Sequence, residues 1–131
     1  MNSRHWITLS VLALAIAPAT AQPAAPALPG NQCFSTTQFE NWRAADAKTI
    51  YIRVRGNHFY RLAMGGECSA ALLPSAQLIT VFRGSNLVCS ALDWDLKVRP
   101  GLHEFAEPCL VKTMTEMSPD EVAALPPKAR P

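Results

Sequence analysis

The 131-residue sequence lacks the short motifs that mark several large enzyme classes. It has no G-x-S-x-G element, no P-loop and no H-E-x-x-H pair, which excludes nucleophile-elbow hydrolases, P-loop nucleotide hydrolases and zincin proteases. His58 and His103 have no partner at a recognisable metal-ligand spacing. We therefore expect no metal or cofactor, and the sequence favours a protein that is not an enzyme.

Runs of one charge and long apolar stretches are also missing. Basic and acidic residues number 12 and 10 and form no long run of one sign, so nucleic acid is not an expected partner. The longest apolar run, residues 6–17, is too short to span a bilayer. Arg4 precedes it and Ala19-Thr20-Ala21 follows, which predicts a secretory signal peptide cleaved after Ala21. We expect a periplasmic or secreted protein with no transmembrane segment after cleavage; an uncleaved anchor helix is the alternative.

Cysteine occurs only four times, and no two cysteines form a C-x-x-C pair. Their spacing argues against a zinc site or a redox-active dithiol. An even number of cysteines in an oxidising compartment predicts two disulfides. Three pairings are open. We favour the nested one, Cys68–Cys89 inside Cys33–Cys109, because it would staple the middle hairpin and join the two ends of the domain.

The chain after residue 21 is expected to form one β-rich domain. Residues 22–30 are rich in Pro and Ala and predict an extended linker; the domain covers residues 31–127, and residues 128–131 form a frayed tail. Residues 77–83 are apolar on both faces, which predicts a central strand covered on both sides. Residues 92–99 alternate, which predicts a strand with one shared apolar face: Leu92, Trp94, Leu96 and Val98.

The C-terminal part predicts one more strand and a helix. The strand lies within residues 107–117, and Ser118-Pro119-Asp120-Glu121 forms a capping box that begins a short helix. The fold class is all-β, or β-rich α+β. We expect an antiparallel barrel or sandwich of about six or seven short strands, one helix and two disulfides.

The clearest hairpin spans Thr49 to Met64. A three-residue loop, residues 56–58, would pair Val54 with Tyr60 and gather one apolar face, and register follows the buried face. This apolar face comprises Ile50, Ile52, Val54, Tyr60, Leu62 and Met64. The opposite face then carries the candidate binding residues, which we call the arginine–aromatic face: Tyr51, Arg53, Arg55, Phe59 and Arg61. Such a face can bind carboxylates or phosphates; an ordinary solvated sheet face is the alternative.

Other polar residues favour structural interpretations. Asp93 and Asp95 would share one strand face with Lys97 and Arg99, which indicates a charge ladder more than a paired-carboxylate site. Three methionines could suggest copper, but scattered methionines are typical of core filling. These are Met64, Met114 and Met117.

Several stretches of the sequence together resemble a known family. They are C-F-x(4)-F-x-x-W (Cys33–Trp42), D-A-K-T-I-Y-I (Asp46–Ile52), F-Y-R-L (Phe59–Leu62), Cys68, C-S-A-L-D (Cys89–Asp93), C-L-V (Cys109–Val111) and S-P-D-E-V-A-A-L (Ser118–Leu125). The chain is similar to a family of small exported proteobacterial proteins of unknown function. The resemblance implies a periplasmic location and transfers no catalytic residue.

Together these observations favour a non-enzymatic binding or structural domain of the bacterial envelope. The expected partner is an envelope protein or an anionic envelope glycan, held by the arginine–aromatic face. The alternative is a periplasmic enzyme or an enzyme inhibitor, the latter with residues 83–86 as a protruding loop.

Overall fold

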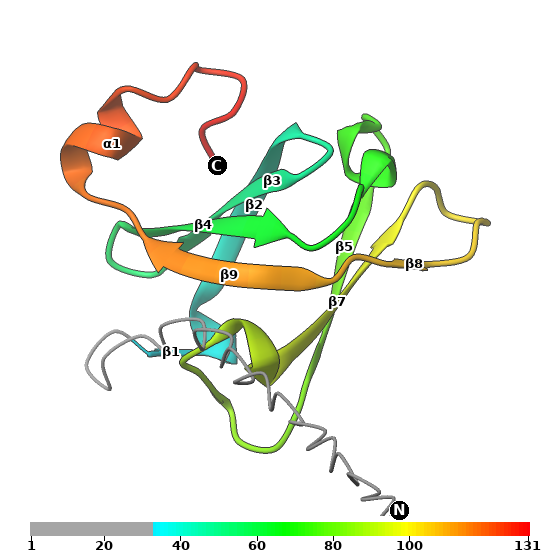
Figure 1. The fold of residues 1–131 in the computed structure, drawn as a ribbon, viewed down its shortest axis with the longest axis horizontal. Coiled ribbons are helices and arrows are strands. Elements are labelled where there is room, and N and C mark those ends of the chain that lie inside the picture. The colour runs from blue at the N-terminus through cyan, green and yellow to red at the C-terminus, as the bar shows by residue number, and fades with distance from the viewer. Residues whose placement is uncertain (1–32) are drawn as a thin grey trace, which may run out of the picture.

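The computed structural model describes residues 33–131, so the expected signal peptide and linker lie outside the described part of the chain. This part contains nine strands, three 3-10 helices and one α-helix (Figure 1). The strands are β1 (Phe34–Ser35), β2 (Phe39–Asp46), β3 (Thr49–Val54), β4 (His58–Met64), β5 (Gln77–Phe82), β6 (Leu87–Val88), β7 (Trp94–Arg99), β8 (Glu107–Pro108) and β9 (Val111–Glu116). The helices are η1 (Thr36–Gln38), η2 (Ser69–Leu72), η3 (Ala91–Asp93) and α1 (Pro119–Ala123).

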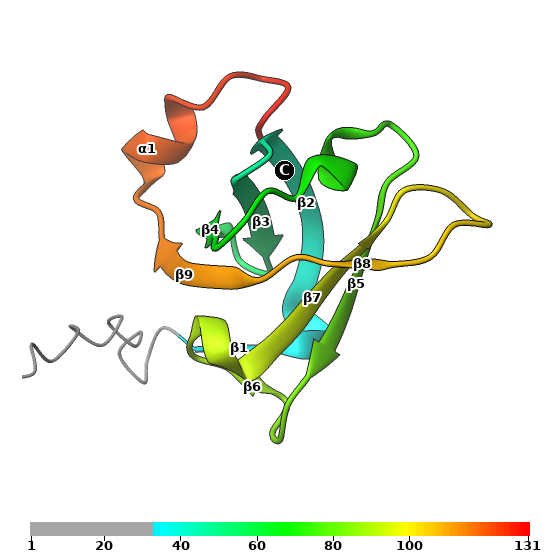
Figure 2. The same cartoon turned by 45° about the vertical axis from the view of Figure 1, so that its right-hand side comes forward.

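The strands form three antiparallel sheets with the orders β2-β3-β4-β9, β5-β7-β8 and β1-β6. Figure 2 shows the four-stranded sheet above the long β5–β7 pair, with β1 and β6 below. Side chains from all three sheets meet in one core, among them Ile52, Leu62, Val88 and Leu96. The strand-rich fold class is confirmed, and the sheets do not close into a barrel. No helix of residues 33–131 is long and apolar enough to cross a membrane.

The β3–β4 hairpin has the expected buried face but a shifted turn. Val54 pairs with His58, and Ile52 with Tyr60, so the three-residue loop is residues 55–57 and not residues 56–58. Gly56 and Asn57 occupy this loop with φ of 82° and 61°, a left-handed conformation that glycine and asparagine tolerate best. The partner of Val54 is His58 and not Tyr60, so the strand pairing is shifted by two residues. Such a shift leaves the same side chains on each face, and all six predicted apolar side chains are buried.

The prediction of a central strand covered on both sides is wrong. Within residues 33–131, β5 is an edge strand that pairs with β7, and Val81 is 48% exposed. The strand predicted at residues 92–99 begins only at Trp94, because residues 91–93 form η3 and leave Leu92 82% exposed. Leu96 and Val98 do point into the core. The side chain of Trp94 lies outside the described part of the structure.

The favoured nested disulfide pairing is also wrong, although both disulfides form. The bonds are Cys33–Cys89 and Cys68–Cys109, an interleaved pattern. Cys33 and Cys89 extend the β1–β6 pairing, in which Phe34 faces Val88. Cys68 lies beyond β4, and Cys109 lies where the chain passes from β8 to β9. The second bond therefore ties the four-stranded sheet to the three-stranded one.

The C-terminus matches the expected helix but not the expected frayed tail. Ser118 is the N-cap of α1, with Pro119 in its first turn and a complete capping box through Glu121. The tail then returns to the domain, since Ala129 is only 7% exposed and Pro131 is also buried. Residues 128–131 are therefore part of the packed structure.

The disulfide pattern can be tested by tryptic digestion without reduction. Cleavage after lysine and arginine separates the four cysteines, and Cys68 and Cys89 fall in the peptides 62–83 and 84–97. We expect mass spectrometry to find peptide 62–83 linked to the peptide that holds Cys109, and peptide 84–97 linked to the peptide that holds Cys33. A linked pair of 62–83 with 84–97 would contradict the structure and restore the nested pattern.

Candidate functional site

The structure brings most of the arginine–aromatic face together. Tyr51 pairs with Arg61 and Arg53 pairs with Phe59 across β3 and β4. These four side chains share one side of the sheet, because alternate residues of a strand point the same way. Arg55 is different, since it begins the turn and is exposed. The face is therefore a patch of two cross-strand pairs with a fifth residue at its edge.

Two arginines of this face have acidic neighbours. Arg53 Nε lies 3.1 Å from Glu40 Oε2, a charge contact whose angles fall outside a hydrogen bond. Arg61 lies near Glu121 of α1, and its charge contributes to lowering the pKa of that carboxyl group. The interaction of Arg61 with Glu121 places α1 beside the outer side of the sheet, where Phe59 also lines a groove with residues of α1.

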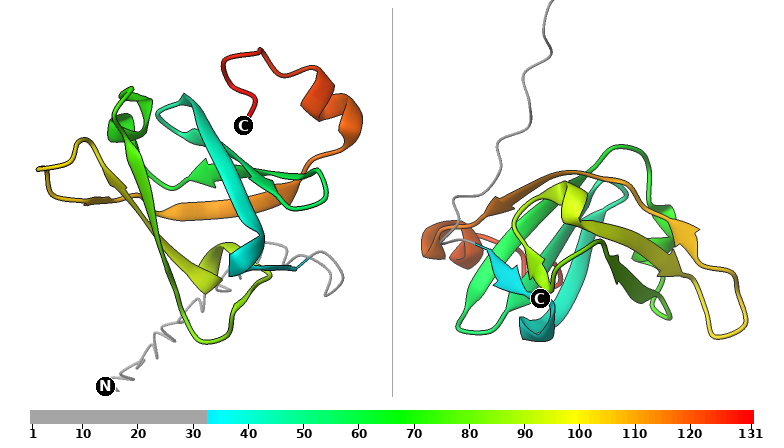
Figure 3. Two further views of the ribbon diagram at one scale, coloured as in Figure 1. Left: turned by 180° about the vertical axis from the view of Figure 1, so that it is seen from behind. Right: turned by 90° about the horizontal axis from the view of Figure 1, so that it is seen from below.

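An open groove of about 620 Å³ runs between α1 and the start of β4. We call it the α1 groove. Its walls are apolar and come from β4, the end of β9 and α1: Phe59, Met117, Pro119, Val122 and Ala123. Its polar rim consists of Asn57, His58, Glu116 and Arg130. Figure 3 shows from two further directions that α1 stands at one end of the molecule, away from β5 and β7.

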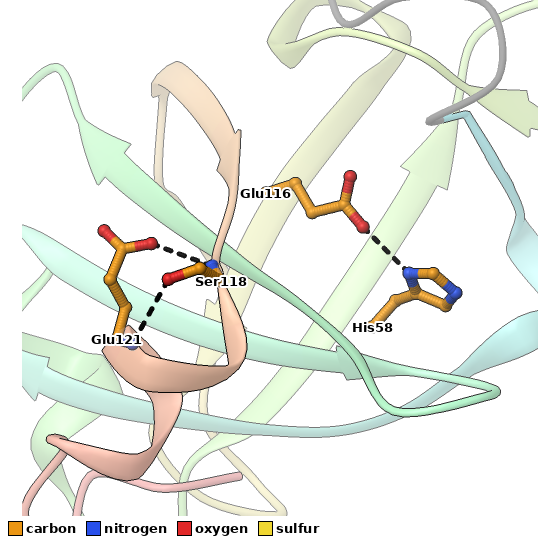
Figure 4. Close-up of polar contacts among 4 residues, drawn as sticks. All are labelled: His58, Glu116, Ser118 and Glu121. Atoms are coloured by element: carbon orange, nitrogen blue, oxygen red, sulfur yellow. Dashed lines mark hydrogen bonds and ion pairs between the residues drawn. The ribbon is translucent and has the colours of Figure 1, made fainter.

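Figure 4 shows two polar contacts near the groove, the hydrogen-bonded pair of His58 with Glu116 and the capping box of Ser118 with Glu121. His58 Nδ1 lies 2.8 Å from Glu116 Oε1, which links β4 to β9 at the rim. On the helix side, the Glu121 carboxylate accepts the Ser118 amide at 2.8 Å, and Ser118 Oγ accepts the Glu121 amide at 3.3 Å. Hydrogen bonding to the Glu121 carboxylate, first from the backbone amide of Ser118 and then from its side chain, is the main cause of the lowered pKa of Glu121.

Arg130 connects the C-terminal tail to the helix. Its Nη2 donates to the carbonyl oxygens of Ala123 and Leu125 at 2.9 and 3.0 Å. Ala123 is the last residue of α1 and Leu125 lies just beyond it, at the end where helices leave acceptors without internal partners. Arg130 therefore closes the end of α1 and at the same time places a cation on the groove rim.

The α1 groove combines five apolar residues with few polar groups. His58 and Glu116 form its titratable pair, and no group of three histidine, cysteine or acidic residues gathers anywhere in residues 33–131 to hold a metal ion. The five apolar wall residues and the polar rim match the general form of a ligand pocket, which is mostly apolar with few polar groups.

The other polar candidates do not form a site. Asp93 belongs to η3, where its Oδ2 accepts the amides of Cys89 and Ser90 at 2.8 and 2.6 Å. The predicted place of Asp93 on the strand face of a charge ladder is therefore wrong, whereas Asp95 of β7 does lie 3.6 Å from a cation, Arg83, at the end of β5. His103 is exposed in the β7–β8 loop.

Sequence reasoning missed most of the α1 groove. It predicted the helix, but it did not predict which surface the helix would meet. His58 was assigned to the turn, and its partner Glu116 is 58 residues away. Arg130 was assigned to a frayed tail. Only Phe59 belongs both to the predicted face and to the groove.

Tyr60 pairs with Glu116 in the register of β4 and β9 and is almost fully buried. Its ring is 5.2 Å from the ring of Phe34, measured between centroids. Burial, with a smaller contribution from the Glu116 charge, raises the pKa of Tyr60 to about 12. The neutral phenol is therefore the form that the fold stabilises.

This raised pKa predicts a loss of stability in alkali. An unfolded tyrosine ionises near pH 10, so the contribution of Tyr60 is fully present below pH 10 and is lost as the pH rises towards 12. We expect the free energy of unfolding in urea to fall more steeply between pH 9.5 and pH 11 for the native chain than for Tyr60→Phe. Equal slopes would show that Tyr60 is not protected from ionisation.

Comparison with known proteins gives a family and no activity. Searches among curated proteins and among solved structures found no match to the chain. The model of one family matches residues 1–131, which is the whole sequence. The chain therefore belongs to DUF6491, a family of unknown function.

Proposed function

We propose that the protein is a non-catalytic binding domain that holds a segment of a partner protein in the α1 groove. The observation that carries this proposal is the open apolar groove with a polar rim that includes Arg130. Arg55 stands close by, because it lines a small cavity together with His58 and Glu116 of the rim. The partner segment should therefore combine a large apolar side chain with neighbouring acidic residues.

The groove favours a protein partner over an anionic glycan. Sugars present hydroxyl groups on most of their surface, and the walls formed by Phe59, Met117 and Val122 offer those groups no hydrogen bonds. An apolar side chain loses water on the same walls at a gain of roughly 25 cal/mol per Å². The arginine–aromatic face, next to the groove, supplies charge-assisted hydrogen bonds to carboxylates.

The binding takes place outside the cytosol in this proposal. Two disulfides support such a location, because disulfides persist in oxidising compartments. The N-terminal apolar run with its small-residue cleavage motif supports export as well. Sequencing the N-terminus of the protein purified from its native host tests this part, with Gln22 as the expected first residue.

Binding in the groove can be tested with 1-anilinonaphthalene-8-sulfonate, which joins an apolar ring system to an anionic group. We expect the chain from Gln22 to bind this probe saturably and with perturbed NMR signals from Phe59 and Val122. Ala123→Glu places a carboxylate on the groove wall and should weaken binding about tenfold, equivalent to ~1.4 kcal/mol. Ala124→Glu is the matched control, because this neighbouring alanine is exposed and does not line the groove.

Two results would contradict this proposal. One is that Ala123→Glu and Ala124→Glu both bind the probe as tightly as the native chain does, since the probe would then bind outside the groove. The other is that the NMR signals of the groove residues are perturbed by polygalacturonate, an anionic polysaccharide, and not by the probe. The second result would favour a glycan partner.

A further inference from the structure

A second unusual feature lies at the opposite end of the molecule from the α1 groove. The loop between β7 and β8, residues 100–106, extends away from the sheets (Figure 1). It carries two large apolar side chains, Phe105 at 95% and Leu102 at 75% exposure. We call it the finger loop. Single exposed apolar residues are common, but two on one projecting loop mark a contact surface more often.

The base of the finger loop is braced. Ser75 Oγ donates to the Pro100 carbonyl at 2.6 Å, and the Glu104 amide donates to the Gly101 carbonyl at 3.2 Å. The pairing of Val98 with Glu107 closes the two sides of the loop. A braced loop loses less conformational freedom on binding than a free one, so its exposed side chains are suited to insertion.

Two acidic residues adjoin Phe105, and the basic residue nearest to the loop in sequence, Arg99, lies at its base. Glu104 and Glu107 are both exposed and flank Phe105. This combination of a large apolar side chain with acidic neighbours has the chemistry that the α1 groove accepts. Acidic residues also oppose insertion into an anionic membrane surface, which attracts basic segments.

We propose that the finger loop of one copy of the chain inserts into the α1 groove of a second copy. Phe105 and Leu102 meet the apolar walls around Phe59 and Val122, and Glu104 and Glu107 face Arg130 on the rim. This inference rests on the proposed function and names the partner of that same groove.

The geometry makes this association head-to-tail. The finger loop and α1 lie at opposite ends of the molecule in every view (Figures 1 and 3). Each copy would therefore use its loop on one neighbour and its groove on another, and such a heterologous contact yields open chains unless it closes into a ring. Two inserted side chains bury far less than the roughly 1,200–2,000 Å² of a stable interface, so the chains form only at high concentration.

The test uses two variants of the chain from Gln22 that each remove one side of the contact. Phe105→Ser keeps the groove, and Ala123→Glu keeps the finger loop. We expect sedimentation equilibrium up to about 1 mM to show a growing series of oligomers for the native chain. Each variant alone should remain a monomer, and a mixture of the two should form 1:1 pairs that do not grow. Leu92→Ser is the control, because it removes another large apolar side chain, 82% exposed, elsewhere on the surface and should assemble like the native chain.

The outcomes separate the two proposals. A native chain that stays monomeric at 1 mM while its groove still binds 1-anilinonaphthalene-8-sulfonate overturns the self-association and leaves the groove as a binding site. Assembly that Phe105→Ser abolishes but that mixing does not restore shows that the finger loop contacts some other surface, and it also overturns the inference. Loss of both probe binding and assembly removes both proposals.

Discussion

The register of the β3–β4 hairpin is the constraint on which the rest of this structure depends. A loop of three residues, with Gly56 and Asn57 at positive φ, pairs Ile52 with Tyr60 and directs every second side chain into the core. A shift by one residue would expose that row and bury Arg53 and Arg61. The same register supplies the outer side of the sheet, where Phe59 forms one wall of the α1 groove. Core and candidate site are thus two faces of one hairpin.

The disulfides hold this hairpin against the other two sheets. Cys33–Cys89 spans a sequence separation of 56 residues and Cys68–Cys109 one of 41. By the chain-entropy estimate, each bond stabilises the folded state by about 4 kcal/mol. Cys33–Cys89 ties the short β1–β6 sheet, whose two-residue strands form too few hydrogen bonds to be stable alone. Cys68–Cys109 ties the end of β4 to the segment that enters β9. The interleaved order therefore braces all three sheets with two bonds.

Local sequence patterns predicted those features of the fold that depend on residues close together in the chain. Alternation identified the buried row from Ile50 to Met64, and the capping box placed the start of α1 at Ser118. The cysteine pairing could not be predicted in this way, because it follows from the pairing of β1 with β6, which lie more than 50 residues apart. The edge position of β5 was missed for a related reason. Apolar residues on both faces fit a buried strand, but here Ile79 and Val81 lie on a half-covered outer face beside Lys97 and Asp95.

The candidate site was the least predictable part because its two walls differ in how they are held. The β4 wall belongs to the hairpin and is fixed by the core. The α1 wall follows Cys109 and lies outside both disulfide-closed loops. It is held by a capping box worth roughly 0.5–2 kcal/mol, by the two hydrogen bonds of Arg130 and by the burial of Ala129. Segments held by few contacts open at a lower free energy than the whole domain unfolds. The α1 wall therefore opens at a lower free energy than the core, so the candidate site can widen without disturbing the core.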